Sequence, residues 1–168
     1  MKNIKKRMNK VYLLLGSNMG DRKAYLLQAL DLLNKHAGTV EKKSLLYEAE
    51  AWGHREQDPF LNQVICIRTK HNPFQLLSII LDLELKMGRQ RFDKWHQRII
   101  DIDILFFENR IINEKDLNIP HPHISERRFT LMPLVELVPD FLHPECNKTM
   151  TELLSECSDS LGVKVFME

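Results

Sequence analysis

The sequence has few cysteines, the residues that form disulfides and many structural zinc sites. Its three cysteines, Cys66, Cys146 and Cys157, are far apart and form no C-x-x-C pair of the kind used by zinc sites and redox motifs. We therefore expect reduced thiols, as is usual for a cytoplasmic protein. No apolar run approaches the roughly 18 to 20 residues that a membrane-spanning helix needs, so neither a secreted nor a membrane protein is expected.

Excess charge and glycine-rich loops are also missing. The 24 basic and 23 acidic side chains leave a net charge of +1, which gives no overall field to attract nucleic acid or an anionic membrane. Any specificity for anions must therefore be local. Neither G-x-x-x-x-G-K-[ST] nor G-x-G-x-x-G occurs, so a nucleotide would have to be held in some other way.

The length predicts one compact domain. A chain of 168 residues with 43% hydrophobic content can bury one core but is short for two. We assign residues 10–168 to this single domain and residues 1–9 to a short basic N-terminal arm. A monomer is expected.

The hydrophobic pattern switches between strand and helix along the chain. Short apolar or β-branched runs predict strands, and apolar residues at helical spacing predict helices. Gly38 is expected as a left-handed cap at the end of the first helix. The expected elements are a strand at 11–15, a helix at 21–37, β-like stretches within 39–51, a strand at 60–69, a helix from Asn72 and Pro73 to just before Gly88, a strand at 98–107 and weaker helical patterning around 129–137.

This order of elements predicts an α+β fold. A β-α-β-β-α-β succession suits a ferredoxin-like sandwich, in which the helices cover one face of an antiparallel sheet. The residues after the last of these strands are then a C-terminal appendage. A fold of this kind does not by itself decide the function.

The sharpest chemical feature is the pair Asp101 and Asp103. Residues i and i+2 of a strand point to the same face, about 6 to 7 Å apart along the chain, so the two carboxylates converge. Magnesium prefers hard oxygen ligands and is usually held by one or two carboxylates together with substrate phosphates. The pair therefore indicates a magnesium site.

An isolated D-x-D more often marks the solvated face of an edge strand. Here the flanking residues 99–106 are otherwise apolar, which indicates a mostly buried strand where unpaired carboxylates would be costly. Arginine stays charged and matches phosphate oxygens bidentately, although a basic cluster can also be an ordinary solvated face. The nearby cations are Arg89, Arg91, Lys94, Arg98, Arg127 and Arg128.

Five patterns in order resemble the hydroxymethyldihydropterin pyrophosphokinase family. They are G-S-N-x-G-D-R at 16–22, W-G-x-x-x-Q-x-P-F-L-N at 52–62, E-x-x-x-G-R-x-R at 84–91, R-I-I-D-I-D-I-L at 98–105, and P-H-P at 120–122 with R-x-F-x-L-x-P-L at 127–134. The resemblance spans roughly residues 10 to 140. It implies transfer of a diphosphate from ATP, as co-substrate, to 6-hydroxymethyl-7,8-dihydropterin in folate biosynthesis.

The resemblance also implies roles for individual residues. Asp101 and Asp103 would bind two Mg²⁺ ions that bridge the ATP phosphates, with Arg89 and Arg91 as further catalytic groups. Other residues near the nucleotide would be Glu84, Trp95, Arg98, Ile104, His121 and Arg127, with the arginines and His121 facing phosphates and Ile104 facing the adenosine.

For the pterin, the resemblance implies that Phe60 and Phe129 stack on its two faces while Asn62 hydrogen-bonds its polar edge. Main-chain groups near Ala49 and Trp52 would assist. A flat heterocycle gains from aromatic faces and needs its buried donors and acceptors paired. Without the resemblance, both phenylalanines would be interpreted as core residues.

The chain departs from the family pattern in the segment before the paired aspartates. The usual W-G-P-R is W-H-Q-R at 95–98, and the stretch between Arg91 and Trp95 is one residue shorter than expected. Two alternatives stay open from the residues alone. One is a binding module that stacks RNA bases on Phe60 and Phe129, and the other is a magnesium phosphohydrolase with water as the nucleophile.

Overall fold

The computed structural model describes residues 8–51, 57–89 and 98–167, which form a mixed α/β fold around an antiparallel sheet. Residues 1–7, and with them most of the proposed basic arm, lie outside the described residues. The strands are β1 (Asn9–Ser17), β2 (Thr39–Lys43), β3 (Tyr47–Ala49), β4 (Phe60–Thr69), β5 (Asp101–Phe107), β6 (Ile112–Glu114), β7 (Leu117–Ile119) and β8 (Val163–Val165). The helices are α1 (Arg22–His36), α2 (Pro73–Lys86), α3 (Arg128–Leu137) and α4 (Met150–Glu156), with a short 3₁₀ turn, η1 (Ile124–Glu126), before α3.

The main sheet runs in the order β5-β1-β4-β3-β8, with β2 also paired to β4. Strands β4 and β5 flank β1 and are both antiparallel to it, so β1 is a central strand. This explains why residues 11–15 read as a continuous apolar run rather than as an alternating one, because both faces of a central strand are covered. The predicted strands at 11–15, 60–69 and 98–107 are confirmed, although β5 begins only at Asp101.

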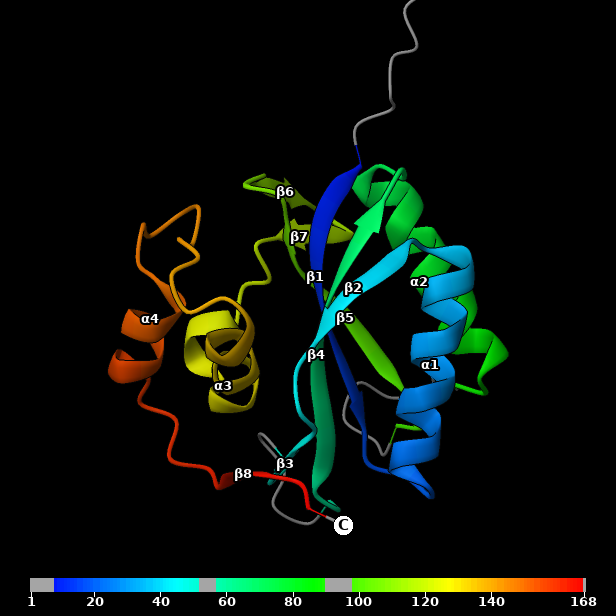
Figure 1. Ribbon diagram of the computed structural model, residues 1–168, viewed down its shortest axis with the longest axis horizontal. Helices are drawn as coiled ribbons and strands as arrows, with labels where there is room; N and C mark the ends of the chain where they lie inside the picture. The colour runs from blue at the N-terminus through cyan, green and yellow to red at the C-terminus, as the bar shows by residue number, and fades with distance from the viewer. Residues whose placement is uncertain (1–7, 52–56, 90–97, 168) are drawn as a thin grey trace, which may run out of the picture.

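Alternate residues of the central strands fill two separate hydrophobic clusters. Val11, Leu13 and Leu15 pack with α1 and α2 on one face, while Tyr12 and Leu14 pack toward α3 and α4 on the other. Figure 1 shows these two pairs of helices on opposite sides of the sheet. The period-2 alternation of strand side chains creates this division.

The two helices of the expected β-α-β-β-α-β core lie on one face of the sheet, as predicted, but the appendage covers the other face, which was not expected. The core helices are α1 and α2, and the helices of the appendage are α3 and α4 (Figure 1). A sheet with apolar side chains on both faces must bury both of them. The cluster on the α3 face accordingly includes Leu131, Leu134, Met150 and Leu153, all buried.

The helix boundaries follow local signals with one exception. Asn72 caps α2 in a reciprocal capping box with Gln75, and Pro73 occupies the first turn, as predicted. Gly38, in contrast, does not have the left-handed backbone expected of it. Its small size is what matters, because a Cβ there would lie 2.3 Å from the main-chain oxygen of Arg68 on β4.

Within the described residues, no helix combines the length and the apolar character that crossing a bilayer requires.

Candidate active site

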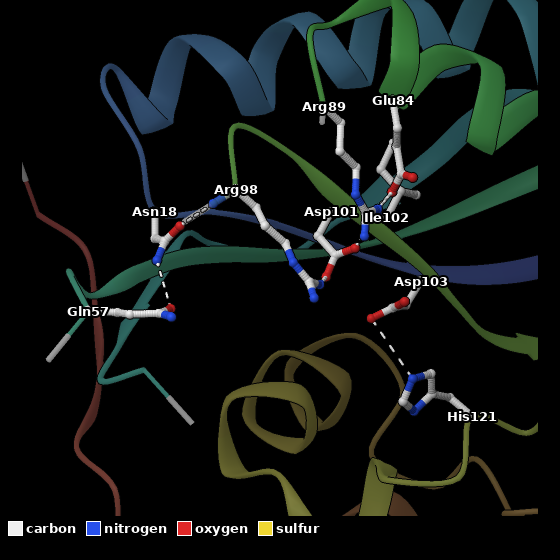
Figure 2. Close-up of polar contacts among 9 residues, drawn as sticks. All are labelled: Asn18, Gln57, Glu84, Arg89, Arg98, Asp101, Ile102, Asp103 and His121. Carbon is white, nitrogen blue, oxygen red and sulfur yellow. Dashed lines mark hydrogen bonds and ion pairs between the residues drawn. The ribbon is translucent and has the colours of Figure 1, made fainter. Parts of the chain in front are cut away.

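The paired carboxylates lie at the start of β5, on the face of the sheet that α3 covers. Ile102 and Ile104, the residues that alternate with them, are buried in the cluster on the α1 and α2 face. Asp101 and Asp103 consequently point to the opposite face, as the i, i+2 spacing predicted. Figure 2 shows both carboxylates above α3, with His121 beyond Asp103.

Gly16 forms the floor between these carboxylates and the neighbouring strand β4. It is opposite Asp101 on one side and opposite Asn62 on the other. A Cβ at Gly16 would lie 3.0 Å from Asn62 Oδ1 and 3.7 Å from Phe60 Cδ1, so these two side chains extend over the glycine. Because Gly16 has no side chain, residues proposed for two different ligands can share one surface.

Two arginines contact the Asp101 carboxylate. Arg89 Nη1 lies 2.8 Å from Asp101 Oδ1, and Arg98 Nη1 donates to Asp101 Oδ2 (Figure 2). Both guanidinium groups are partly exposed, so they can also reach a ligand. The predicted association of arginines with the aspartates is thus present in the structure.

Glu84 lies behind these charges at the end of α2. Its side chain is only 2% exposed, and Oε1 accepts the Ile102 N–H at 2.7 Å and contacts Arg89 Nη1 at 2.5 Å. Gly88, with a φ of +92°, turns the chain after α2 so that Arg89 comes back toward Glu84. Burial raises the pKa of Glu84 to about 7, although Arg89 opposes this shift. Glu84 therefore supports β5 and Arg89 from below the surface.

Asp103 has a different environment. His121 Nε2 lies 3.9 Å from Asp103 Oδ2, and a main-chain hydrogen bond of 3.0 Å to Leu105 O fixes His121 beside β5. Burial raises the pKa of Asp103, and the neighbouring charge of Asp101 adds to the effect. Burial and then Arg127 lower the pKa of His121 to about 4, so its ring is neutral at pH 7. A neutral imidazole can donate one hydrogen bond to an anionic ligand without adding a positive charge to the site.

The residues proposed for the pterin come together from three elements. Ala49 on β3 is directly opposite Phe60 on β4, and Tyr47 is opposite Asn62. Phe129, at the start of α3, packs against the cluster on the same face, with the Arg127 guanidinium 5.7 Å from its ring centroid. Asn62 is 3% exposed, and its Nδ2 has no hydrogen-bond partner among the described residues. A buried amide donor of this kind indicates a polar ligand.

The side chain of Ile104 is not brought into this group. It is 6% exposed and packs in the cluster on the α1 and α2 face, opposite to the carboxylates. Trp52, Arg91 and Trp95 lie outside the described residues.

Asn18, which the sequence shows only as part of the G-S-N-x-G-D-R pattern at 16–22, connects two distant segments of the site. Its Oδ1 accepts the Arg98 N–H at 2.7 Å, and its Nδ2 donates to Gln57 Oε1 and Asp58 O at 3.4 Å each. The main-chain N–H of Asn18 also donates to Arg98 O at 3.1 Å. One side chain thus ties together segments that carry Asp58 and Arg98, 40 residues apart in sequence (Figure 2). The side chain of Asn18 is only 1% exposed, and this burial could not be recognised from the sequence pattern.

Comparison with known proteins decides the family. Residues 12–139 match the family described as 7,8-dihydro-6-hydroxymethylpterin-pyrophosphokinase (HPPK). The chain belongs to this family. Two relatives named 2-amino-4-hydroxy-6-hydroxymethyldihydropteridine pyrophosphokinase agree with it. The protein from Bacillus subtilis is 40% identical over 95% of this chain and 92% of its own length, and that from Aquifex aeolicus is 42% identical over 89% and 92%.

Solved HPPK structures share the fold. In the crystal structure of Plasmodium falciparum HPPK-DHPS A437G with SDX-DHP, the match has a TM-score of 0.74 at 20% identity and covers 92% of this chain. In the wild type with STZ-DHP, the TM-score is 0.73 at 19% identity, covering 89%. The chain corresponds to less than half of those proteins, at 46% and 43% of their lengths. The family match and the two relatives confirm the resemblance that the five patterns together predicted.

Proposed function

We propose that this chain transfers the diphosphate of ATP to 6-hydroxymethyl-7,8-dihydropterin, giving AMP and the pterin diphosphate ester in folate biosynthesis. The hydroxyl oxygen of the pterin attacks the β-phosphorus of ATP in line. A new O–P bond forms, the bond from the β-phosphorus to the oxygen bridging it to the α-phosphorus breaks, and the hydroxyl proton is released. AMP leaves with the electron pair of the broken bond.

The observation that carries this proposal is the single surface built around Gly16. Asp101 lies opposite Gly16 on one side and Asn62 on the other, so carboxylates suited to a metal and an amide suited to a heterocycle are neighbours across one strand. Transfer between two bound substrates requires this closeness, because holding the reactants in register supplies much of the rate enhancement. Family membership supplies the identity of the two substrates.

Asp101 and Asp103 fit magnesium through the chemistry of their donors. They supply hard carboxylate oxygens on one face of the sheet. Within the described residues, no group of three or more His, Cys, Asp or Glu side chains could hold a metal, so the protein would supply only these two carboxylates. Magnesium is commonly held by one or two carboxylates, with substrate phosphates and water completing its shell. We propose two ions at this pair, which would neutralise charge on the phosphates when bound.

The arginines provide the complementary part of the site. Arg89 and Arg98 offset the charge of Asp101, so the two carboxylates can lie close together without a metal ion. If Mg²⁺ were bound by the carboxylates, the guanidinium groups of Arg89 and Arg98 could contact phosphate oxygens, which they match bidentately. We propose Arg89, Arg91 and Arg98 as phosphate ligands, joined by Arg127 and His121.

Glu84, Trp95 and Ile104 complete the proposed nucleotide site. Glu84 acts through its hydrogen bond to Ile102 N and its contact with Arg89. Because the Ile104 side chain is buried in the core, any contact from Ile104 would come from its main chain.

For the pterin, we propose stacking between Phe60 and Phe129 and hydrogen bonds to Asn62. Nδ2 of Asn62 supports the last contact, because it has no hydrogen-bond partner in the described part of the chain and a buried donor costs free energy unless it is paired. Main-chain groups of Ala49 and Trp52 are proposed to complete the site.

We also propose a fold type, a domain organisation and a location for the chain. The strand order β5-β1-β4, with β2 and β3 both beyond β4, supports a ferredoxin-like arrangement for the core. We also propose residues 10–168 as one domain preceded by a basic arm, a monomeric state and a cytoplasmic location.

Resolving the nucleotide products tests the function. The chain is incubated with ATP, Mg²⁺ and the reduced pterin alcohol, and AMP is expected in equal amount to the pterin diphosphate. Stoichiometric ADP with a monophosphorylated pterin would refute the reaction. Phosphate or pyrophosphate release without pterin would instead indicate a phosphohydrolase, and salt-dependent RNA binding without turnover would indicate a binding module.

A further inference from the structure

The segment after α4, residues 157–167, contacts both sides of the proposed pterin site. One side is the beginning of α3, which carries Phe129, and the other is β3, which carries Ala49. Figure 1 shows the chain leaving α4, passing α3 and ending in β8 beside β3. The segment belongs to the expected C-terminal appendage, for which no function was predicted.

On the first side, Asp159 caps α3 from a distance. The residue at the cap position of α3 is Arg127, whose guanidinium group has only donors and cannot accept a hydrogen bond from the first N–H groups of the helix. The Arg128 N–H, in the first turn, instead donates to Asp159 Oδ2 at 3.0 Å, and the other oxygen of Asp159 accepts the Leu161 N–H at 3.1 Å. A carboxylate at a helix N-terminus also interacts favourably with the helix dipole. Asp159 thus holds the turn that contains Phe129.

On the second side, β8 adds a strand to the edge of β3. Val163 is opposite Ala49, which is itself opposite Phe60, so one row of cross-strand neighbours leads from the segment to the proposed stacking residue. Main-chain hydrogen bonds extend the pairing at both ends, from Glu50 N to Gly162 O at 3.2 Å and from Phe166 N to Leu46 O at 2.8 Å.

Phe166 fixes the end of the segment through its side chain. Its ring packs against the cluster on the α1 and α2 face and lies 5.9 Å from the Arg22 guanidinium carbon. Arg22 in turn donates to Pro59 O at 2.6 Å and to Glu48 Oε2 at 2.7 Å. The segment is therefore connected to the main chain immediately before Phe60 as well as to β3.

We infer that residues 157–167 act as a clasp that sets the spacing between α3 and β3, with Asp159 as a positioning residue for pterin binding. Stacking a ring between Phe60 and Phe129 requires two aromatic faces at a fixed separation, and a small displacement of one face weakens both contacts. The far end of α3 is fixed independently, because Glu136 accepts hydrogen bonds from Leu45 N and the Tyr47 hydroxyl. Loss of the Asp159 cap then releases the end that carries Phe129. This inference rests on the proposed pterin site.

The test compares ligand affinities of Asp159→Ala with those of two matched variants. Asp159→Asn retains an acceptor oxygen, and Ser160→Ala changes an exposed neighbour. Dissociation constants for the pterin and for a non-hydrolysable ATP analogue are measured at a temperature where every variant is fully folded. We expect Asp159→Ala to raise the pterin constant about tenfold, equivalent to a lost hydrogen bond of roughly 1.4 kcal/mol, with less than about a twofold change for the ATP analogue. Asp159→Asn should recover most of the affinity, and Ser160→Ala should match the wild type.

A lower melting temperature with an unchanged pterin constant in Asp159→Ala would make the segment purely structural and overturn the inference. If that variant does not fold, Phe166→Ala tests the other attachment, with Met167→Ala, 84% exposed, as its control. Phe129→Ala is measured alongside. An unchanged pterin constant in Phe129→Ala would remove the proposed site itself, whereas a weakened Phe129→Ala with unaffected Asp159→Ala and Phe166→Ala would remove only the clasp.

Discussion

Asp101 and Asp103 are two residues apart on one strand, yet their neighbours differ. Arginines contact Asp101 on both carboxylate oxygens, whereas the neutral His121 lies near Asp103. The pKa of Asp103 is raised by burial, so its ionised form opposes folding. A charge kept at a cost in stability is typical of a functional group.

Substitution of Asp103 tests this conflict between stability and function. Asp103→Asn keeps the size of the side chain but removes the charge, so we expect turnover to fall at least about 100-fold, as when one electrostatic contact to a transition state is removed. The melting temperature at pH 7 should stay the same or rise. Steady-state kinetics and thermal unfolding measure the two effects. Asp82→Asn, at an exposed aspartate of α2, is the control. Near-normal turnover in Asp103→Asn would exclude the metal role.

Gly16 offers a second prediction at the scale of one residue. The Cβ of Gly16→Ala would lie 3.0 Å from Asn62 Oδ1, so the Asn62 amide has to shift. We expect the pterin dissociation constant to rise about tenfold, the effect of weakening one buried hydrogen bond, without a change for an ATP analogue. A double-mutant cycle with Asn62→Ala identifies the cause, because the double variant should bind no worse than Asn62→Ala alone. Additive losses would mean that Gly16 acts independently of Asn62.

At the scale of elements, the end of α2 determines how β5 presents its carboxylates. The capping box at Asn72 fixes where α2 begins, and Gly88 turns the chain where it ends. Glu84, in the last turn, then reaches the Ile102 N–H of the edge strand. Without this acceptor, a buried main-chain donor of β5 would lose its partner.

The buried Glu84 predicts a pH dependence of stability. Burial raises its pKa to about 7 in the folded state, from 4.5 when exposed. Between these values the folded chain holds a proton that the unfolded chain has lost, so this group lowers stability as the pH rises from about 4.5 to 7. Glu84→Gln has no such proton, so the free energy of unfolding of the wild type should decline relative to that variant across this window. Urea unfolding at several pH values measures the difference.

Glu114→Gln, at an exposed position of β6, controls for the loss of one carboxylate. A constant difference between wild type and Glu84→Gln from pH 4.5 to 7 would contradict the prediction, because it would mean that Arg89 keeps Glu84 ionised throughout.

At the scale of the molecule, one sheet supports two cores. Leu33 of α1 and Leu131 of α3 are both fully buried, in clusters on opposite faces. The strands β1, β4 and β5 contribute side chains to both clusters, so neither face can lose its packing without exposing strands that the other face needs.

We therefore expect a single cooperative unfolding transition, destabilised to a similar degree by a cavity-forming substitution on either face of the sheet. Leu33→Ala and Leu131→Ala should each lower the free energy of unfolding by about 2–5 kcal/mol, the usual cost of emptying a buried leucine site. In each variant, the denaturant dependence of the free energy of unfolding should equal that of the wild type. Far- and near-ultraviolet circular dichroism should report the same transition. Two separated transitions in Leu131→Ala would mean that α3 and α4 form a second unit, against the proposed single domain. Leu27→Ala, an exposed position of α1, is the control.

Local signals in the sequence determined most of the elements. Apolar runs predicted β1, β4 and β5, and the pair Asn72 and Pro73 predicted the start of α2, because strand periodicity and helix capping depend on residues close in sequence. The strand at β5 also placed Asp101 and Asp103 on a common face without any tertiary information. The order of the motifs gave the family, since five patterns together are far more specific than one.

Only the tertiary structure decided which distant residues meet. That Gly16 separates Asp101 from Asn62, that Asn18 connects Asp58 with Arg98, and that Asp159 caps α3 all depend on strand register and on contacts across 31 or more residues. The two-sided packing of the sheet belongs to the same class. No local pattern encodes such contacts, because they form only when long-range burial of apolar surface selects one arrangement of the elements.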